Sequence, residues 1–295
     1  MKILSLLLSL FTFVFIGCED EGPGPSVNLW GVDYSIKNTV KLELFNTNSS
    51  GSIPPEIGDL TNLRHLDLGK NQFSGPIPPE IGNLTDLSFL SLKENQLTGP
   101  ILAKIGSLQK LNYLYLNGNQ LTGAIPEEIG ELDNLFELDL SYNKLSGSIP
   151  PEILNMESLT DLILGSNELS GTISYQIRYL SHMTGELDLS HNLLTGVIPY
   201  QIGDLIYLEH LDLSGNQFSG AIPSEIGEFT PSLRWLFLND NQLAGIIPED
   251  ICDIPNIWFS ANDFEFFNIS RNKLCPPYPT CFEGYHTDQD SSDCF

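Results

Sequence analysis

Residues 63–82 read LRHLDLGKNQFSGPIPPEIG, and this stretch decides the fold. Leu66 and Leu68 are two positions apart, so on a short strand they share one face and can be buried together. His65 and Asp67 then point the opposite way. Asn71 ends the strand, where its amide can pair with backbone groups that the turn leaves free. The double proline that follows excludes a regular helix interior, so extended or 3₁₀ segments are expected there.

The same pattern recurs along the chain. Its asparagines begin an N-x-[LF] step and are 24 or 25 residues apart: Asn71, Asn95, Asn119, Asn143, Asn167, Asn192, Asn216 and Asn241. A copy that starts at Thr39 has Thr47 in the asparagine position, and Asn272 belongs to a truncated last copy. Such a period predicts a solenoid of nine full repeats whose neighbours bury one continuous core.

The pattern L-x-x-L-x-L-x-x-N-x-L-x-G-x-I-P, found over residues 39–256, resembles the plant-specific subclass of leucine-rich repeats. Receptor ectodomains and polygalacturonase-inhibiting proteins belong to that subclass. The resemblance implies an α/β-type but mostly β solenoid, curved and right-handed. A parallel sheet is expected on the concave face, 3₁₀ or extended segments on the convex face, and a second short sheet at the L-x-G-x-I-P step. Leu102 and Ser174 replace the motif proline, so local irregularity is expected there.

Both ends of the stack need covers. Residues 18–38 are expected to form a linker and an N-terminal cap, residues 39–263 the repeats with an insertion, and residues 264–295 a truncated repeat and C-terminal cap. Trp30-Gly31-Val32 resembles the W-x-G-V element of plant repeat caps, without its usual flanking cysteines. Trp30 is therefore expected to cover the first repeat by packing alone.

Four cysteines lie near the C-terminus, and they allow three disulfide pairings: Cys252, Cys275, Cys281 and Cys294. The run from Asn272 to Cys275, followed by Cys281, resembles the capping cysteine pair of plant-type repeats. That resemblance implies a Cys275–Cys281 bridge, which leaves Cys252 to pair with Cys294. Zinc binding is the competing interpretation, and the lack of a paired C-x₂₋₄-C spacing speaks against it.

Residues 1–17 are interpreted as an export signal. The apolar run from Ile3 to Ile16 is too short for a comfortable membrane span. Val14–Cys18 resembles a permissive bacterial lipobox, in which Cys18 becomes the lipidated first residue. The acidic residues 19–21 are similar to an outer-surface export signal of some Gram-negative groups. The expected location is therefore the outer membrane or cell surface, and a freely secreted protein is the alternative.

The net charge of the chain limits the classes of partner that it can bind. The chain has 38 Asp and Glu against 13 Lys and Arg, a formal net charge of −25. Such a surface repels nucleic acid and anionic lipid, so nucleic acid is excluded and contact with a membrane is expected only through a lipid anchor at Cys18. The charge favours cationic partners, or it serves solubility alone. The chain is expected to be a monomer.

Two clusters are predicted on the outward strand positions. Phe89, Tyr113, Tyr115 and the adjacent Phe136 form an aromatic patch, which indicates either ligand binding or the ordinary preference of aromatic residues for sheets. Trp235 and Phe237 either extend the binding surface or pack under an insertion at 257–263.

The second cluster is acidic: Glu137, Asp139, Asp161, Glu186, Asp188 and Asp212. Like charges at strand spacing repel unless a cation or a basic partner relieves them. The alternative is repeat consensus, since L-D-L-S is common in this family. His210 stands beside the acidic residues and could complete a metal site, although no metal is predicted.

These observations favour a non-enzymatic binding module that uses no cofactor. No nucleophile elbow, zinc-protease motif or phosphate loop is present in the sequence. The expected ligand is a protein, a peptide or a glycan on the concave face. Alternatives are an inhibitor of a secreted hydrolase and a passive envelope or adhesion protein.

Overall fold

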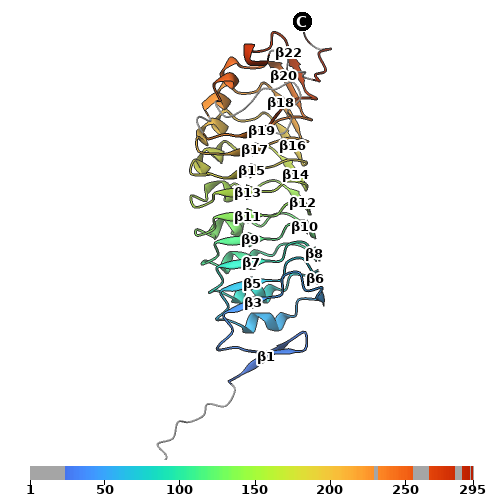
Figure 1. Cartoon of the computed structure of the whole chain (residues 1–295), viewed down its shortest axis with the longest axis vertical. Coiled ribbons are helices and arrows are strands. Elements are labelled where there is room, and N and C mark those ends of the chain that lie inside the picture. The colour runs from blue at the N-terminus through green and yellow to red at the C-terminus, as the bar shows by residue number, and fades with distance from the viewer. Residues whose placement is uncertain (1–23, 229–231, 255–265, 283–287, 293, 295) are drawn as a thin grey trace, which may run out of the picture.

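A computed structural model describes residues 24–228, 232–254, 266–282, 288–292 and 294. The chain forms a column of ten similar coils, stacked in sequence order (Figure 1). Each coil adds one strand to each of two sheets and one short 3₁₀ helix on the convex side. The predicted solenoid is therefore confirmed. The signal segment with Cys18 and the insertion at 257–263 lie outside the described residues.

The first sheet has ten parallel strands, and its outward side is the concave face. In order along the column these strands are β3 (Lys41–Glu43), β5 (His65–Asp67), β7 (Phe89–Ser91), β9 (Tyr113–Tyr115), β11 (Glu137–Asp139), β13 (Asp161–Ile163), β15 (Glu186–Asp188), β17 (His210–Asp212), β19 (Trp235–Phe237) and β21 (Phe267–Asn268). Equivalent residues of neighbouring repeats are paired, as Leu114 is with Leu90 and Leu138.

The L-x-G-x-I-P step forms the second ten-stranded parallel sheet, as the resemblance implied. Its strands are β4 (Ser50–Gly51), β6 (Gln72–Pro76), β8 (Gln96–Gly99), β10 (Gln120–Gly123), β12 (Lys144–Gly147), β14 (Glu168–Gly171), β16 (Leu193–Gly196), β18 (Gln217–Gly220), β20 (Gln242–Ile246) and β22 (Lys273–Cys275).

The convex side carries the 3₁₀ helices η1 (Pro55–Asp59), η2 (Pro79–Asn83), η3 (Ala103–Ser107), η4 (Glu127–Glu131), η5 (Ile153–Asn155), η6 (Tyr175–Leu180), η7 (Tyr200–Asp204), η8 (Ser224–Glu228), η9 (Glu249–Asp253) and η10 (Thr280–Phe282). The repeated leucines and isoleucines fill the space between helices and sheets. Leu66, Leu68 and Phe73 are fully buried in this core, as are their equivalents along the stack.

The repeated asparagines form the ladder that the sequence predicts. Asn119 is 8% exposed, and its Nδ2 donates to the carbonyls of Leu92 and Leu116, both at 3.0 Å. Its Oδ1 accepts the Leu97 N–H of the preceding repeat, also at 3.0 Å. Each asparagine thus pairs backbone groups within its own coil and with the coil before it, at the turn where neither sheet can do so.

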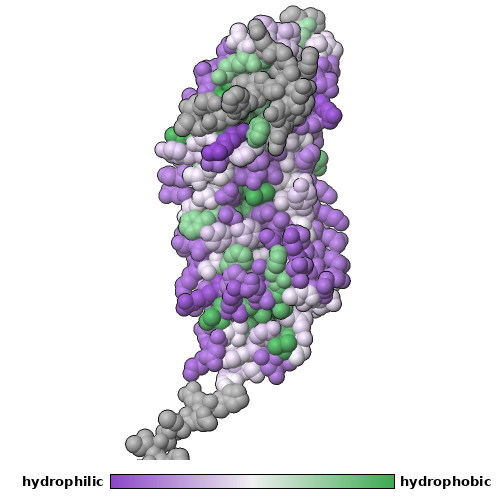
Figure 2. All heavy atoms as spheres, in the orientation of Figure 1, coloured by the Kyte–Doolittle hydropathy of each residue, from purple (hydrophilic) through white to green (hydrophobic). Residues whose placement is uncertain are grey.

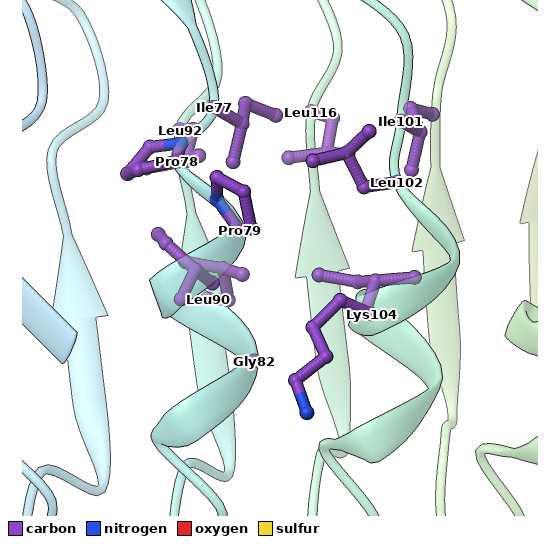
Figure 3. Close-up of a pocket in the computed structure, with 12 residues that line it drawn as sticks. Ile77, Pro78, Pro79, Gly82, Leu90, Leu92, Ile101, Leu102, Lys104 and Leu116 are labelled. Carbon is purple, nitrogen blue, oxygen red and sulfur yellow. The ribbon is translucent and has the colours of Figure 1, made fainter. Parts of the chain in front are cut away.

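Adjacent convex helices approach closely at a glycine. A Cβ on Gly82 would lie 2.6 Å from the carbonyl oxygen of Lys104 and 2.3 Å from its Cγ, so only glycine fits between η2 and η3 (Figure 3). A small apolar pocket lies between the same two helices, beside Ile77, Leu90 and Ile101. Its volume of about 20 Å³ holds no more than one water molecule, so we assign it to the core.

The N-terminal cap is a hairpin of β1 (Ser26–Leu29) and β2 (Val32–Ser35). The Trp30 ring lies 5.0 Å from that of Phe73, so the tryptophan covers the first repeats as predicted. Packing alone does not hold it, because the indole Nε1 also donates to the carbonyl of Ser52 at 3.0 Å.

The predicted disulfide pairing is wrong. The bridges are Cys252–Cys281 and Cys275–Cys294, with Cα–Cα distances of 5.7 and 5.6 Å. Cys252 lies on η9 and Cys281 on η10, and the stacking of convex helices brings them together. Cys275 lies on β22, on the far side of the core from those helices, so it is paired with the C-terminal segment instead.

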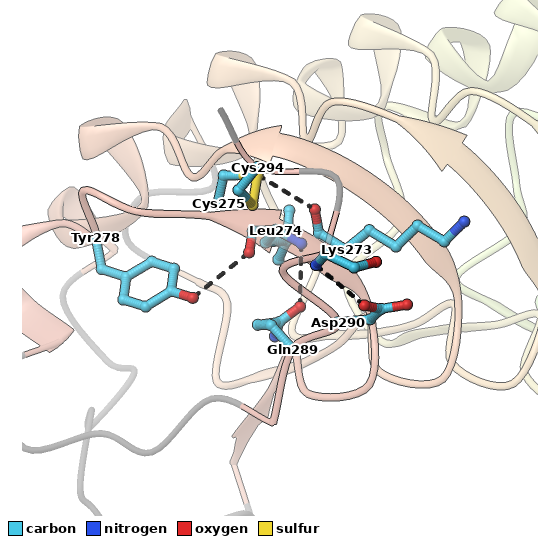
Figure 4. The surroundings of a disulfide bond; sticks show 8 residues. Lys273, Leu274, Cys275, Tyr278, Gln289, Asp290 and Cys294 are labelled. Carbon is cyan, nitrogen blue, oxygen red and sulfur yellow. Dashed lines mark hydrogen bonds between the residues drawn. A yellow bond between two sulfur atoms is a disulfide. The ribbon is translucent and has the colours of Figure 1, made fainter.

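Hydrogen bonds also hold that segment against β22 and the residue before it (Figure 4). The Leu274 N–H donates to Gln289 Oε1 at 3.2 Å, and the Asp290 N–H donates to the Asn272 carbonyl at 2.8 Å. The segment therefore covers the otherwise open end of the second sheet.

Of the two expected irregularities, only one is present. Leu102 has the extended backbone of the motif prolines, and η3 has the same five residues as η2, so the expectation there is wrong. At Ser174 the helix η6 has six residues, and the Ser174 hydroxyl accepts the N–H of Gln176 at 3.2 Å. The hydroxyl replaces the proline ring as the feature that starts the helix.

Candidate functional site

The concave face presents two rows of side chains, one from the first and one from the third residue of each strand. We expected these residues to be exposed, yet those from β5 to β19 other than Ser91 are half-buried, because neighbours one strand apart cover each other. Ser91 is fully buried. Lys41 and Glu43, at the open N-terminal edge, are exposed. Most of the surface seen in Figure 2 is hydrophilic, and hydrophobic residues form small separate patches.

An aromatic cluster occupies β5 to β11, and it contains the four aromatic residues predicted for this site. Ring centroids are 6.0 Å apart for Phe89 and Tyr113, 5.6 Å for Phe89 and Tyr115, and 6.3 Å for Tyr113 and Phe136. His65 extends the cluster, since its ring stacks on Phe89 at 4.3 Å with an interplanar angle of 8°. His65 was missed, although it directly precedes Phe89 in the same row.

Tyr115 is held in place from two sides. Its hydroxyl donates to Glu137 Oε2, and the Lys93 ammonium lies 5.4 Å from the centre of its ring. Burial, and then the hydrogen bond and charge of Glu137, raise the pKa of Tyr115 above its ordinary value. The phenol therefore stays neutral at physiological pH and presents a fixed ring to a ligand. Phe136 is more open, with 41% of its side chain exposed.

The charge of the repeats is strongly polarised along the column, a feature that the net charge alone does not reveal. Residues 39–111 hold 7 acidic and 6 basic residues, whereas residues 112–253 hold 21 acidic and 3 basic residues. The aromatic cluster lies at the junction. On its N-terminal side the ammonium groups of Lys70 and Lys93 are 5.7 and 5.9 Å from the ring of Phe45. On its C-terminal side the concave face is acidic.

Three predicted acidic residues have a structural role. Asp139, Asp188 and Asp212 each accept the backbone N–H two residues later, at 3.0, 2.8 and 2.8 Å. Burial raises the pKa of Asp139 and of Asp188 despite these hydrogen bonds. The repeat-consensus interpretation therefore explains why aspartate is found at this position. It leaves the outward negative charge in place.

Asp161 is the first residue of its strand and so belongs to the other row of the concave face. Its carboxylate accepts different hydrogen bonds from those of the three aspartates above. Its Oδ1 accepts the Glu186 N–H at 3.0 Å, and its Oδ2 accepts the Thr160 hydroxyl at 2.7 Å. A Cβ on Gly185 would lie 2.0 Å from Asp161 Oδ1, so the glycine of the 25-residue repeat makes room for this carboxylate.

A second aromatic group lies at the C-terminal end of the concave face. The rings of Trp235 and Phe237 are each 5.7 Å from His210, and Trp235 also packs against Phe266 at 6.2 Å. The His210 Nδ1 lies 2.9 Å from Glu186 Oε1. Burial alone would lower the pKa of His210, but the hydrogen bond and charge of Glu186, followed by Asp212 and Asp188, raise it overall.

The structure brings His210 and its acidic neighbours together as predicted. His210 is paired with Glu186, and Asp188 and Asp212 accept hydrogen bonds from backbone N–H groups. Within the described residues, the set of side chains with ligand atoms close enough to share a metal ion is a different one: Glu43, His65 and Asp67. None of the helices in the described ranges has the length and apolar character needed to cross a membrane.

Two leucine-rich-repeat family models match, one at residues 104–145 and 157–218 and the other at 62–84 and 232–254. No curated protein sequence matches the chain.

Solved structures that are similar over most of the chain include the following three. A plant peptide hormone receptor, RGFR1 in complex with RGF2, is 37% identical over 80% of this chain, with a TM-score of 0.72. A plant ice-binding protein is 35% identical over 82%, with a TM-score of 0.67, and the LIC12759 repeat protein of Leptospira interrogans is 31% identical over 82%, with a TM-score of 0.60. The matched part spans 37% of the hormone receptor, 74% of the ice-binding protein and 67% of the Leptospira protein.

Proposed function

The chain belongs to the leucine-rich-repeat family, and from that premise we propose that it captures an extended peptide or protein segment outside the cytoplasm. The observation that carries the proposal is the continuous run of five rings on four adjacent strands, from His65 on β5 to Phe136 beside β11. Clustered aromatic side chains with accessible faces are a typical feature of binding surfaces.

Recognition on this face depends on side chains. Strands β5 to β19 are paired on both sides, so a peptide cannot join the sheet as a further strand. Phe89, Tyr113 and Phe136 instead offer ring faces and edges over three repeats, roughly 10 Å at the usual strand spacing of about 4.8 Å. An extended segment of about three residues matches that span.

Charge indicates the second property of the ligand. The face beyond the aromatic cluster carries Glu137, Glu186 and the partly buried aspartates, and burial and mutual repulsion raise the pKa of Asp139 and Asp188. A basic side chain placed there relieves this repulsion. The ligand therefore combines an apolar or aromatic part with basic residues, and its affinity falls as salt increases.

The similar structures support a peptide more than a glycan. The receptor that is 37% identical is a peptide hormone receptor, and it was solved with RGF2 bound. Because this chain spans only 37% of that receptor, none of the receptor's other activities is transferred to it.

We further propose a surface location through lipidation of Cys18, which the lipobox-like sequence supports. Two disulfides at the C-terminal cap agree with an oxidising compartment. Metabolic labelling with palmitate should label the protein, and Cys18→Ala should lose both the label and the membrane association. Equal labelling of the two proteins would contradict the anchor.

The binding proposal is tested by selecting random dodecapeptides on the immobilised protein. The test variant is the double substitution Tyr113→Ser and Tyr115→Ser, and the matched control is Tyr200→Ser on the convex side, where this tyrosine is 57% exposed. Peptides enriched by the wild type should bind the control equally and the test variant at least about tenfold more weakly, since two aromatic anchors are lost. Equal binding to all three proteins, at equal thermal stability, would refute the site. Enrichment of no peptide, together with capture on a glycan array, would assign the face to sugars instead.

A further inference from the structure

We propose that Glu43, His65 and Asp67 form a binding site for a divalent transition-metal ion such as Zn²⁺. One ligand atom from each residue lies within 4.8 Å of the others. The residues come from the adjacent strands β3 and β5, which pair Glu43 directly with Asp67. In a tetrahedral zinc site, bonds of 2.0–2.2 Å place the ligand atoms about 3.4 Å apart, so small side-chain rotations complete the geometry.

His65 supplies the nitrogen ligand, and its half-buried ring lies beside the carboxylates of Glu43 and Asp67. Its Nε2 is buried and has no hydrogen-bond partner in the part of the chain that the structure describes. A buried nitrogen of this kind is costly unless something binds it.

Asp67 is oriented for the same purpose. Its Oδ1 accepts the Gly69 N–H at 2.9 Å, which fixes the carboxylate and leaves Oδ2 for a metal. Hydrogen bonds that hold a ligating carboxylate in this way are a regular part of metal sites. Nearby, the Ser91 hydroxyl is fully buried and also has no partner within the described residues.

The third ligand is at present held by a cation of the protein itself. Lys41 Nζ lies 2.6 Å from Glu43 Oε2, and both side chains are more than half exposed. Such an exposed ion pair is weak, so a divalent ion can displace the ammonium. Lys41 then acts as a competitor of the metal, and its removal should tighten metal binding.

The donor set selects the class of metal. One imidazole and two carboxylates suit Zn²⁺ and similar transition metals, whereas Ca²⁺ and Mg²⁺ prefer sites built from oxygen alone. Three protein ligands leave at least one coordination position open. Because His65 stacks on Phe89 at 4.3 Å, this open position borders the aromatic cluster, where it can take a carboxylate of a bound ligand. The metal site does not depend on the proposed peptide function.

His210 provides a matched control. It also lies among acidic side chains on the concave face, but its Nδ1 is already 2.9 Å from Glu186 Oε1. The described residues give no group of three ligand atoms around it within the same distance limit.

The test is isothermal titration of the tag-free protein, first treated with a chelator, with ZnCl₂ and, separately, with MgCl₂. The wild type should bind one Zn²⁺ that is lost, or weakened about tenfold or more, in His65→Ala and in Glu43→Gln. His210→Ala should bind as the wild type does, and Lys41→Ala should bind more tightly. Mg²⁺ should not bind at the same concentrations.

No Zn²⁺ binding by the wild type would overturn the proposal. Equal binding by the wild type and Glu43→Gln would do the same, and that variant avoids any question of folding because Glu43 is exposed. Equal losses in His65→Ala and His210→Ala would assign the signal to scattered surface histidines and would also overturn it.

Discussion

Replacement of Asn119 by alanine tests the asparagine ladder on which the stack depends. The side chain is 8% exposed and makes three well-formed hydrogen bonds of 3.0 Å, to the carbonyls of Leu92 and Leu116 and from the N–H of Leu97. At about 1 kcal/mol for each bond, the variant should lose about 3 kcal/mol of unfolding free energy. A loss of this size lowers the melting temperature by roughly 6–12 °C.

The assay is urea unfolding followed by circular dichroism, with Gln120→Ala as the control, since the neighbouring Gln120 is exposed on the second sheet. The control should stay within about 0.5 kcal/mol of the wild type. If Asn119→Ala lost no more than the control, water or neighbouring side chains would be satisfying the freed backbone groups. The ladder would then not hold the coils together.

Three further predictions concern packing, pH and the C-terminal cap. Gly106→Ala should lower the free energy of unfolding by about 2 kcal/mol in the same assay, because its Cβ would lie 2.5 Å from the backbone oxygen of Glu128. An unchanged free energy of unfolding would mean that the convex helices are not closely packed. The raised pKa of His210 adds stability that is complete below its ordinary value of 6.5 and is lost as the pH rises through the raised value. His210→Gln should therefore remove this pH dependence above pH 6.5, and an identical pH profile would contradict it. Mass spectrometry of unreduced peptides should recover Cys252 linked to Cys281, and loss of that bridge should cost about 2–4 kcal/mol; a peptide that joins Cys275 to Cys281 would contradict the structure.

The fold could be predicted almost entirely from one repeat. The spacing of Leu66 and Leu68 sets the strand face, and the asparagine at Asn71 and the double proline set the turn and the return path. Each rule is local and is repeated nine times, so errors at a single position are averaged out. Leu102 illustrates this averaging. Although it is not a proline, the repeats on either side hold it in the extended backbone conformation of the motif prolines.

The site could be predicted only in part, because its properties depend on neighbours one repeat away. The period places Phe89 beside Tyr113 and Tyr115 correctly. It does not reveal that Asp139 caps the backbone of Ser141, or that His65 stacks on Phe89. Both depend on side-chain rotamers.

The disulfide pairing failed for a different reason. The resemblance to plant-type caps implied Cys275 with Cys281, but these residues lie on different layers of the coil, on β22 of the second sheet and on the convex helix η10. Pairing follows the layer of the solenoid in which a cysteine lies. Cys252 and Cys281 both lie on convex helices, η9 and η10, and are therefore paired with each other.

The most direct test of the central claim is photo-crosslinking of a selected peptide that carries a benzophenone at its aromatic position. Mapping of the adducts by mass spectrometry should place them on Phe89, Tyr113, Tyr115 or Phe136, with an excess of unlabelled peptide preventing the reaction. Adducts confined to the convex helices or the caps would show that the concave aromatic cluster is not the binding site.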